Sequence, residues 1–123
     1  MRVLVTDDSK AMRMIVIRSL RQSGLPIGAV VEAEDGEQGL AAVAEHRPDL
    51  ILSDWNMPNK NGLEFLQELR ASGDQTTFGF VTSESNPAIR EKAIGAGAAF
   101  LLSKPFTSER FADVIGQLAR EGV

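Results

Sequence analysis

The sequence contains no cysteine, which excludes a disulfide framework and a thiolate metal site. It has no apolar run of the roughly 20 residues that a membrane-spanning helix needs, and its first residues do not resemble a signal peptide. Basic residues are outnumbered, with 13 Lys and Arg against 17 Asp and Glu and a net charge of -4. These absences favour a cytoplasmic location and argue against nucleic acid or a membrane as partner.

The chain is long enough for one domain and too short for two. Its 123 residues are 43% hydrophobic and 24% charged, which is ordinary for a globular protein with a substantial core. No linker, repeat or low-complexity segment divides it. We therefore expect a single domain over residues 1–123, with no room for an effector domain.

Short apolar runs alternate with helical patterns along the chain. The runs predict five strands, over residues 3–5, 29–31, 50–53, 78–81 and 99–102. Five helices are predicted between and after these strands. The fourth is indicated by Asn86 as N-cap with Pro87 at the first helical position. The other four helices are predicted by apolar residues at helical spacing, which are Met12, Ile15, Val16 and Leu20; Leu40, Val43 and Ala44; Leu63, Leu66 and Leu69; and Phe111, Val114, Ile115 and Leu118.

Strands that are apolar on both faces belong in a parallel sheet that is covered on both sides. Right-handed crossovers then give a doubly wound α/β fold with five strands and five helices. In such a sheet, sites form where the carboxyl ends of the strands meet. The polar residues that follow the predicted strands are Asp7 and Asp8, Asp54, Thr82 with Ser83 and Glu84, and Lys104 with Pro105.

Carboxylates gathered at one edge of a sheet repel one another. Two charges about 4 Å apart cost roughly 4 kcal/mol at an effective dielectric near 20, so the cluster favours a bound cation. Oxygen ligands and an incomplete protein shell suit Mg2+. Lys104 and the Thr82 hydroxyl could then bind a tetrahedral anion while a carboxylate oxygen attacks phosphorus in line.

Four motifs stand in order along the chain, namely Asp7-Asp8, Asp54 within Asp-Trp-Asn-Met-Pro, Thr82-Ser83-Glu84 and Lys104-Pro105-Phe106. Together they resemble the receiver domain of two-component response regulators from end to end. The stretch Asp-Trp-Asn-Met-Pro-Asn and the short chain are most similar to the single-domain chemotaxis type, the CheY-like receivers. The resemblance implies a flavodoxin-like sheet with strand order 2-1-3-4-5 and a monomeric protein.

The resemblance also implies the roles of the site residues. Asp54 is the expected phosphoacceptor, and Thr82 and Lys104 are expected to bind the phosphoryl oxygens. Mg2+ is the expected cofactor, with ligands from Asp7, Asp8, Asp54 and the backbone carbonyl of Asn56.

Further positions carry expectations from the same resemblance. Asn56 and Glu84 occupy the two positions that tune the rate of dephosphorylation, where polar groups orient or block water. Leu101 and Phe106 belong to the expected switch surface, and the bond before Pro105 is expected to be cis.

The implied function is phosphorelay signalling. A sensor histidine kinase would donate a phosphoryl group to Asp54, and the surface of the fourth helix, fifth strand and fifth helix would then switch a downstream protein, such as the flagellar motor switch in chemotaxis. The chain would catalyse only its own phosphorylation and dephosphorylation and would not be an enzyme for other substrates. The alternative within the family is a stand-alone receiver that serves as a phosphate sink or relay in another two-component pathway.

One position departs from the family pattern. Receivers usually carry Tyr or Phe three residues before the lysine, where this chain has Leu101, and the aromatic Phe100 comes one residue earlier. Because strand side chains alternate between faces, we expect Phe100 in the core and Leu101 on the opposite face, towards the fourth helix.

Three other kinds of protein fit these residues less well. A metal-dependent phosphatase with an aspartate nucleophile would alternate its two aspartates after the first strand, whereas Asp7 and Asp8 are adjacent. A flavodoxin would need uncharged phosphate-binding groups in the same place. A degenerate receiver that only docks is disfavoured because no key position is lost. Taken singly, Asp8 reads as no more than a helix N-cap, and Trp55 as an exposed or half-buried ring.

Overall fold

The computed structural model describes residues 1–84 and 86–121, apart from the side chains of residues 119–121. Strands and helices alternate through these residues. The strands are β1 (Val3–Thr6), β2 (Val30–Ala33), β3 (Leu50–Ser53), β4 (Thr77–Thr82) and β5 (Phe100–Ser103). The helices are α1 (Lys10–Gln22), α2 (Gly36–His46), α3 (Gly62–Ala71), α4 (Pro87–Gly95) and α5 (Ser108–Glu121).

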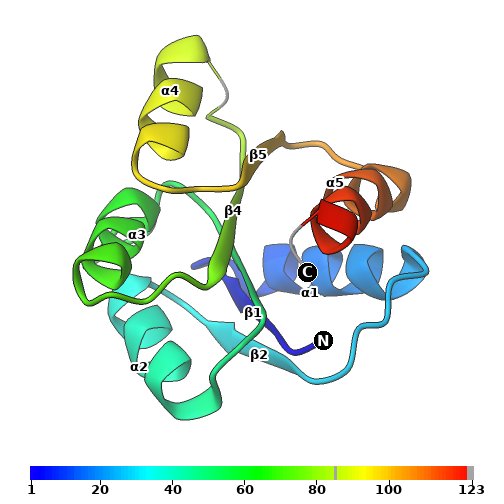
Figure 1. The fold of residues 1–123 in the computed structure, drawn as a ribbon, viewed down its shortest axis with the longest axis horizontal. Helices are drawn as coiled ribbons and strands as arrows, with labels where there is room; N and C mark the ends of the chain where they lie inside the picture. Colours follow the sequence, from blue (N-terminus) through cyan, green and yellow to red (C-terminus); the bar gives the residue numbers. More distant parts are fainter. Residues whose placement is uncertain (85, 122–123) are drawn as a thin grey trace.

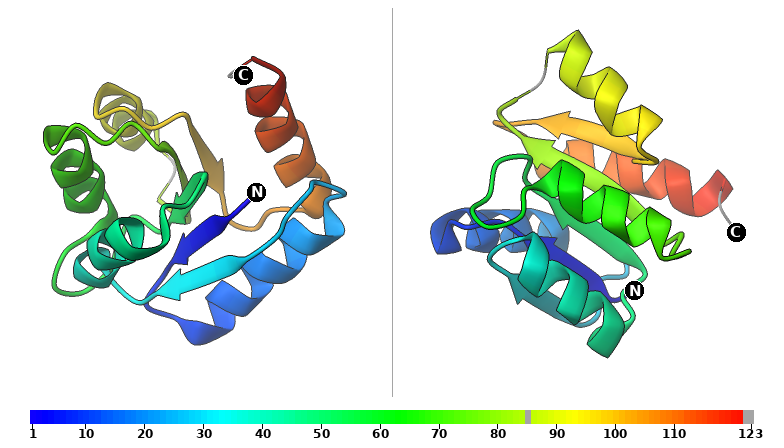
Figure 2. Two further views of the ribbon diagram at one scale, coloured as in Figure 1. Left: turned by 60° about the horizontal axis from the view of Figure 1, so that its bottom comes forward. Right: turned by 90° about the vertical axis from the view of Figure 1, so that its left-hand side faces the viewer.

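The strands form one parallel sheet in the order β2-β1-β3-β4-β5. Figure 1 shows α2, α3 and α4 on one side of this sheet and α1 and α5 on the other, and Figure 2 shows the same layers from two further directions. The register aligns the strand ends, because Thr6 is paired with both Ala33 and Ser53, and Thr82 with Ser103. The predicted doubly wound fold and strand order are confirmed.

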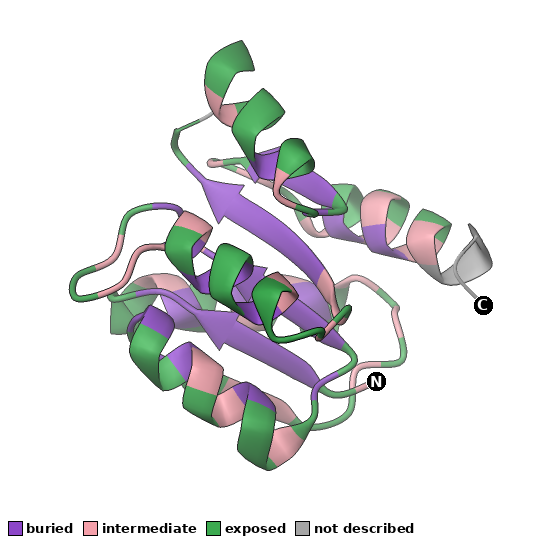
Figure 3. Cartoon of the chain, turned by 60° about the vertical axis from the view of Figure 1, so that its left-hand side comes forward, coloured by how far each residue is buried: buried purple, intermediate pink, exposed green. Residues whose placement is uncertain are grey.

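A separate apolar core fills each side of the sheet. On the side of α2, α3 and α4 the buried residues include Leu4, Ile51, Phe65, Phe78, Phe80, Ala93 and Leu101. On the side of α1 and α5 they include Val3, Val5, Val16, Leu20, Phe100, Phe111 and Ile115. Figure 3 shows that the strands are buried while the helices expose their outer faces, as a sheet covered on both sides requires.

The helices begin where short polar side chains can cap them. Ser9 accepts a hydrogen bond from the Met12 amide at the start of α1. Asn86 caps α4 as predicted, with Pro87 in the first turn. Because Ser9 is the N-cap of α1, the Asp8 carboxylate does not cap the helix and remains available to the site. Among the described residues, no helix combines the length and apolar character needed to span a bilayer.

Some sequence predictions were wrong in detail. Ile15 is predicted to lie on the apolar stripe of α1, but the residue is 46% exposed, because the buried face of the helix runs through Arg13, Val16 and Leu20. Ala44 of α2 is likewise exposed. Trp55 was expected to be exposed or half-buried, yet it is 8% exposed. Its ring packs on Phe80, with centroids 4.9 Å apart, so the loop after β3 folds back over the core.

The expectation for β5 is confirmed. Phe100 packs in the core on the side of α1 and α5, and Leu101 packs in the opposite core, which contains Ala93 of α4. Phe100 is paired with Gly79 of β4, and a Cβ at Gly79 would overlap the Phe100 ring. The glycine therefore makes the space that the shifted aromatic residue fills.

Candidate functional site

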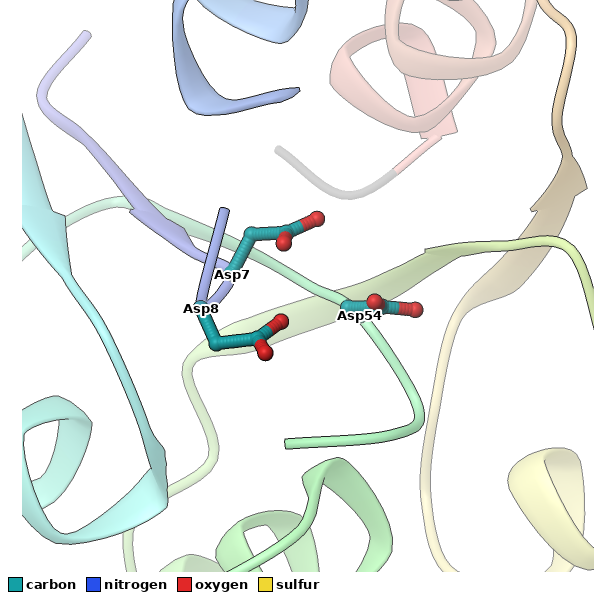
Figure 4. Close-up of side chains that lie close together, drawn as sticks. All are labelled: Asp7, Asp8 and Asp54. Carbon is teal, nitrogen blue, oxygen red and sulfur yellow. The ribbon is translucent and has the colours of Figure 1, made fainter. Parts of the chain in front are cut away.

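Three carboxylates converge at the carboxyl ends of β1 and β3. Asp7 and Asp8 follow β1 and Asp54 follows β3, and one oxygen from each lies within 4.8 Å of the others. Figure 4 shows the three side chains gathered at this edge. The two strands are neighbours, and the Asp54 amide continues their ladder by donating to the Thr6 carbonyl at 2.9 Å. The sheet thus brings the predicted acidic residues together.

Asp7 is the most buried of the three, at 4% exposed. Burial raises the pKa of its carboxyl, and the nearby Asp54 charge acts in the same direction. The amide of Ser9, which donates to Asp7 Oδ1 at 2.9 Å, and the ammonium of Lys104 oppose this rise in pKa. A cation bound nearby would therefore stabilise the charged form of the Asp7 carboxyl.

Lys104 places its ammonium between two of the carboxylates. Its Nζ lies 3.2 Å from Asp7 Oδ2 and 3.6 Å from Asp54 Oδ2. Its backbone amide donates to the Thr82 carbonyl at 2.9 Å, and its bond to Pro105 is cis, as expected. Two groups compensate Asp54 at the end of an apolar strand, namely the Lys104 ammonium and the Trp55 amide, which donates to Asp54 Oδ1 at 2.7 Å.

One lysine does not neutralise three carboxylates. Within the described residues, the Asp8 carboxylate takes part in no hydrogen bond or ion pair, although it faces Asp7 and Asp54. The unpaired charge, the oxygen-only donor set and the partly open position fit a hard divalent cation. The residues present therefore suit Mg2+.

Thr82 ends β4 at the same edge and is fully buried. Its hydroxyl oxygen accepts a hydrogen bond from the Glu84 amide at 3.1 Å, which leaves its own proton free to donate. The side chain of Glu84 reaches back across the edge, since Asn56 Nδ2 donates to Glu84 Oε1 at 3.2 Å. The two predicted rate-tuning residues, which follow β3 and β4, are thus in contact with each other, and both are exposed.

The two residues assigned to the switch surface lie apart from the carboxylates. Leu101 is 2% exposed and packs below the surface. Phe106 is half-buried after the cis proline, and its ring meets Phe111 of α5 edge-on at 4.9 Å. Any contribution of Leu101 to a surface is therefore indirect.

Sequence reasoning missed Arg13 of α1. Its side chain is 8% exposed, with Nη1 donating to the Asp7 carbonyl at 2.7 Å and Nε paired with Glu32 Oε1 at 2.8 Å. The guanidinium thereby fixes the backbone from which Asp7 and Asp8 project. A signal was present, because Arg13 falls on the buried stripe of α1 together with Val16 and Leu20.

Comparisons with known proteins agree with this geometry. The family model of the response regulator receiver domain matches residues 3–116. A probable chemotaxis protein CheY of Rhizobium etli is 34% identical over 111 residues, covering 89% of this chain and 84% of that protein. The response regulator MprA of Mycobacterium sp. (strain KMS) is 37% identical over 108 residues, covering 88% of this chain. The chain spans 46% of that relative's length.

A solved structure agrees as well. The chemotaxis protein CheY4 of Vibrio cholerae superposes with a TM-score of 0.82 at 32% identity, over 94% of this chain and 96% of that one. The chain belongs to the response regulator receiver domain family of two-component systems, whose members are phosphorylated signalling modules with an acidic Mg2+-binding pocket.

Proposed function

We propose that this chain is a receiver that takes a phosphoryl group from a sensor histidine kinase onto Asp54, with Mg2+ required. The observation that carries the proposal is the position of the Asp54 carboxylate. It lies 3.6 Å from the Lys104 ammonium and within 4.8 Å of the carboxylates of Asp7 and Asp8. A nucleophile flanked by a cation and a metal-type cluster is suited to phosphoryl transfer.

In the proposed reaction an Asp54 oxygen attacks phosphorus in line with the kinase histidine. The O–P bond forms as the P–N bond breaks, and the imidazole nitrogen leaves with the electron pair and takes up a proton. Asp7, Asp8, Asp54 and the backbone carbonyl of Asn56 would hold Mg2+, which supplies positive charge to the phosphoryl oxygens. Lys104 binds one phosphoryl oxygen as an ion pair, and the Thr82 hydroxyl donates to another.

In dephosphorylation, water is the nucleophile that attacks phosphorus, and the Asp54 carboxylate is the leaving group. Asn56 and Glu84, which follow β3 and β4, form a hydrogen-bonded bridge that the attacking water would have to pass. The bridge would orient or restrict that water and so set the lifetime of the phosphorylated state. The chain would act on no substrate other than itself.

The output would be a change in the surface of α4, β5 and α5 that a downstream protein reads. The 34% identity to a probable chemotaxis protein CheY supports a role in chemotaxis, with the flagellar motor switch as target. The second candidate is a sink or relay in another two-component pathway, since a relative named only as a response regulator, MprA, is 37% identical and the chain spans 46% of its length. In either case we propose a cytoplasmic monomer that meets the kinase transiently.

Phosphorylation by a small acyl phosphate tests the mechanism. Intact mass spectrometry should find one added phosphoryl group in the presence of Mg2+ and none after chelation. Peptide mapping should place it on Asp54, and Asp54→Asn should remove it without unfolding the chain. Lys104→Ala should keep partial labelling. Label on Ser53 or Ser83 would overturn the assignment.

Phosphotransfer profiling separates the two pathways. Each purified histidine kinase of the source cell is charged with ATP and mixed with the chain. Rapid transfer from a chemotaxis kinase supports the first candidate, whereas preferential transfer from a different kinase supports the second.

A further inference from the structure

The loop between β3 and α3 is fastened to the start of α2 by a buried carboxylate. Asp35 is 5% exposed and caps α2, with Oδ1 accepting from the Gln38 amide at 2.8 Å. Its second oxygen, Oδ2, accepts from Asn59 Nδ2 at 2.7 Å, across 24 residues of sequence. One aspartate therefore serves the helix and the loop at once.

Backbone contacts reinforce the same junction. The Gly36 amide donates to the Lys60 carbonyl at 2.9 Å. A Cβ at Gly36 would lie 2.8 Å from that carbonyl oxygen, so only glycine permits the close approach. The Lys60 ammonium also pairs with Glu37 of α2 at 3.1 Å and with Glu68 of α3.

The conformation of the loop depends on this junction. Asn59 has a φ of 63°, in the left-handed region that Asn tolerates better than most residues. At the other end of the loop, the Trp55 carbonyl accepts from the Gly62 amide at 2.9 Å. Asn56, the proposed carbonyl ligand, stands between these two fixed points.

We propose that the Asp35–Asn59 hydrogen bond is a positioning element of the Mg2+ site, which holds Asn56 in place relative to Asp54. The inference rests on the proposed function. Asp35 and Asn59 are positioning residues, because neither lies in the carboxylate cluster. Loss of the bond frees the middle of the loop, so the site must order it again each time the ion binds.

The size of the effect follows from related cases. Partners that orient metal ligands typically cost about tenfold or more in metal affinity when they are removed. We expect Asn59→Asp to weaken Mg2+ affinity by about tenfold, because it places two carboxylates against each other. In Asp35→Asn the Asn59 amide can turn over and accept from the new amide, so this variant should lose less affinity.

The double variant exchanges donor and acceptor. In Asp35→Asn/Asn59→Asp, the new amide at position 35 still caps α2 through its oxygen and donates through its nitrogen to the new carboxylate. Asn and Asp are both good N-caps and both tolerate a positive φ, so the exchange keeps the backbone intact. Mg2+ affinity should return to within about threefold of the original, since backbone and hydrogen bond are both retained.

The measurement is a Mg2+ titration followed by Trp55 fluorescence and by calorimetry, with a thermal melt of each metal-free variant. Glu34→Gln is the matched control, because it removes one negative charge beside Asp35 from an exposed residue whose carboxylate accepts a hydrogen bond from Gln38 of α2. It should leave Mg2+ affinity unchanged. If Asn59→Asp does not fold, Asn59→Gly removes the donor without strain and is expected to show the same loss of affinity.

The outcomes separate the two proposals. Absence of Mg2+ binding by the unaltered chain refutes the proposed function itself. Normal binding by the unaltered chain and by Asn59→Asp refutes the positioning role. Restored melting temperature without restored affinity in the double variant also refutes it, since the bond would then serve folding alone.

Discussion

Mg2+ should raise the melting temperature of this chain well beyond the effect of salt. The metal-free site holds three carboxylates, with one oxygen from each within 4.8 Å of the others. Two unit charges at that separation repel by about 3.5 kcal/mol at an effective dielectric of about 20. The ammonium of Lys104, 3.2 Å from Asp7 and 3.6 Å from Asp54, offsets only part of this repulsion. The folded state therefore gains from a divalent cation that the unfolded chain binds poorly.

The size of the stabilisation follows from the thermodynamic linkage between Mg2+ binding and folding. At ten times its dissociation constant, Mg2+ adds about 1.4 kcal/mol to the free energy of unfolding, and at one hundred times about 2.7 kcal/mol. For a chain of this length, 1 kcal/mol shifts the melting temperature by roughly 3 to 6 °C. The expected rise is thus about 4 to 8 °C at the lower concentration.

The assay is a thermal melt followed by circular dichroism across a Mg2+ series, with NaCl at matched ionic strength as the control. Salt screens the carboxylates as well, so only the excess over NaCl reports specific binding. Asp8→Asn should raise the melting temperature of the metal-free chain and shrink the response to Mg2+. Equal melting curves in Mg2+ and in matched NaCl would refute the reasoning.

Three further outcomes are expected. Gly79→Ala places a Cβ against the Phe100 ring and should lower the free energy of unfolding by about 1 to 3 kcal/mol. Adding Phe100→Leu to the same chain should recover part of this loss. Urea unfolding measures both effects, and an unchanged midpoint for Gly79→Ala alone would contradict the close packing. Arg13→Met leaves the buried Asp7 carbonyl without its charged donor and should cost about 2 kcal/mol in the same assay, more than Glu32→Gln, which keeps an acceptor. The Gln38 amide and then the Asn59 amide hold the pKa of Asp35 below its usual value, so its stabilising effect is present above the ordinary carboxyl pKa and is lost as the pH falls through the lowered one. Asp35→Asn should therefore flatten the acid side of the stability profile between about pH 5 and pH 2, and an unaltered slope counts against this account.

Much of the fold was predictable because its signals are local. The run 50–53 is apolar on both faces, and Asn86 with Pro87 specifies a helix start within a few residues. Parallel strands then bring their carboxyl ends together, so Asp54 and Lys104 could be placed at one edge although 50 residues separate them. The cis bond before Pro105 came from resemblance alone.

The groups that support the site were not predictable in the same way. Arg13 and Trp55 belong to residue types that are usually at least partly exposed, and each is buried by a partner from a distant segment. The bond between Asp35 and Asn59 depends on how the loop after β3 turns towards α2. The spacing of apolar residues predicts individual helices and strands, but it carries no information about a contact between two loops.

The packing of β5 and α4 indicates where a change at Asp54 can spread. Phe100 and Leu101 fix β5 to the cores on both faces of the sheet, and the Lys104 amide bonds the end of the strand to β4. Helix α4 has one buried residue, Ala93, and its Arg90 side chain donates to the Leu101 carbonyl at 3.2 Å. Displacing β5 would disrupt two cores, whereas displacing α4 gives up the buried Ala93, the partly buried Ile89 and one polar contact. Of these two elements α4 is the less firmly held, so we expect a rearrangement driven by new charge at the site to move α4 rather than β5, with Leu101 as the apolar surface beneath the helix.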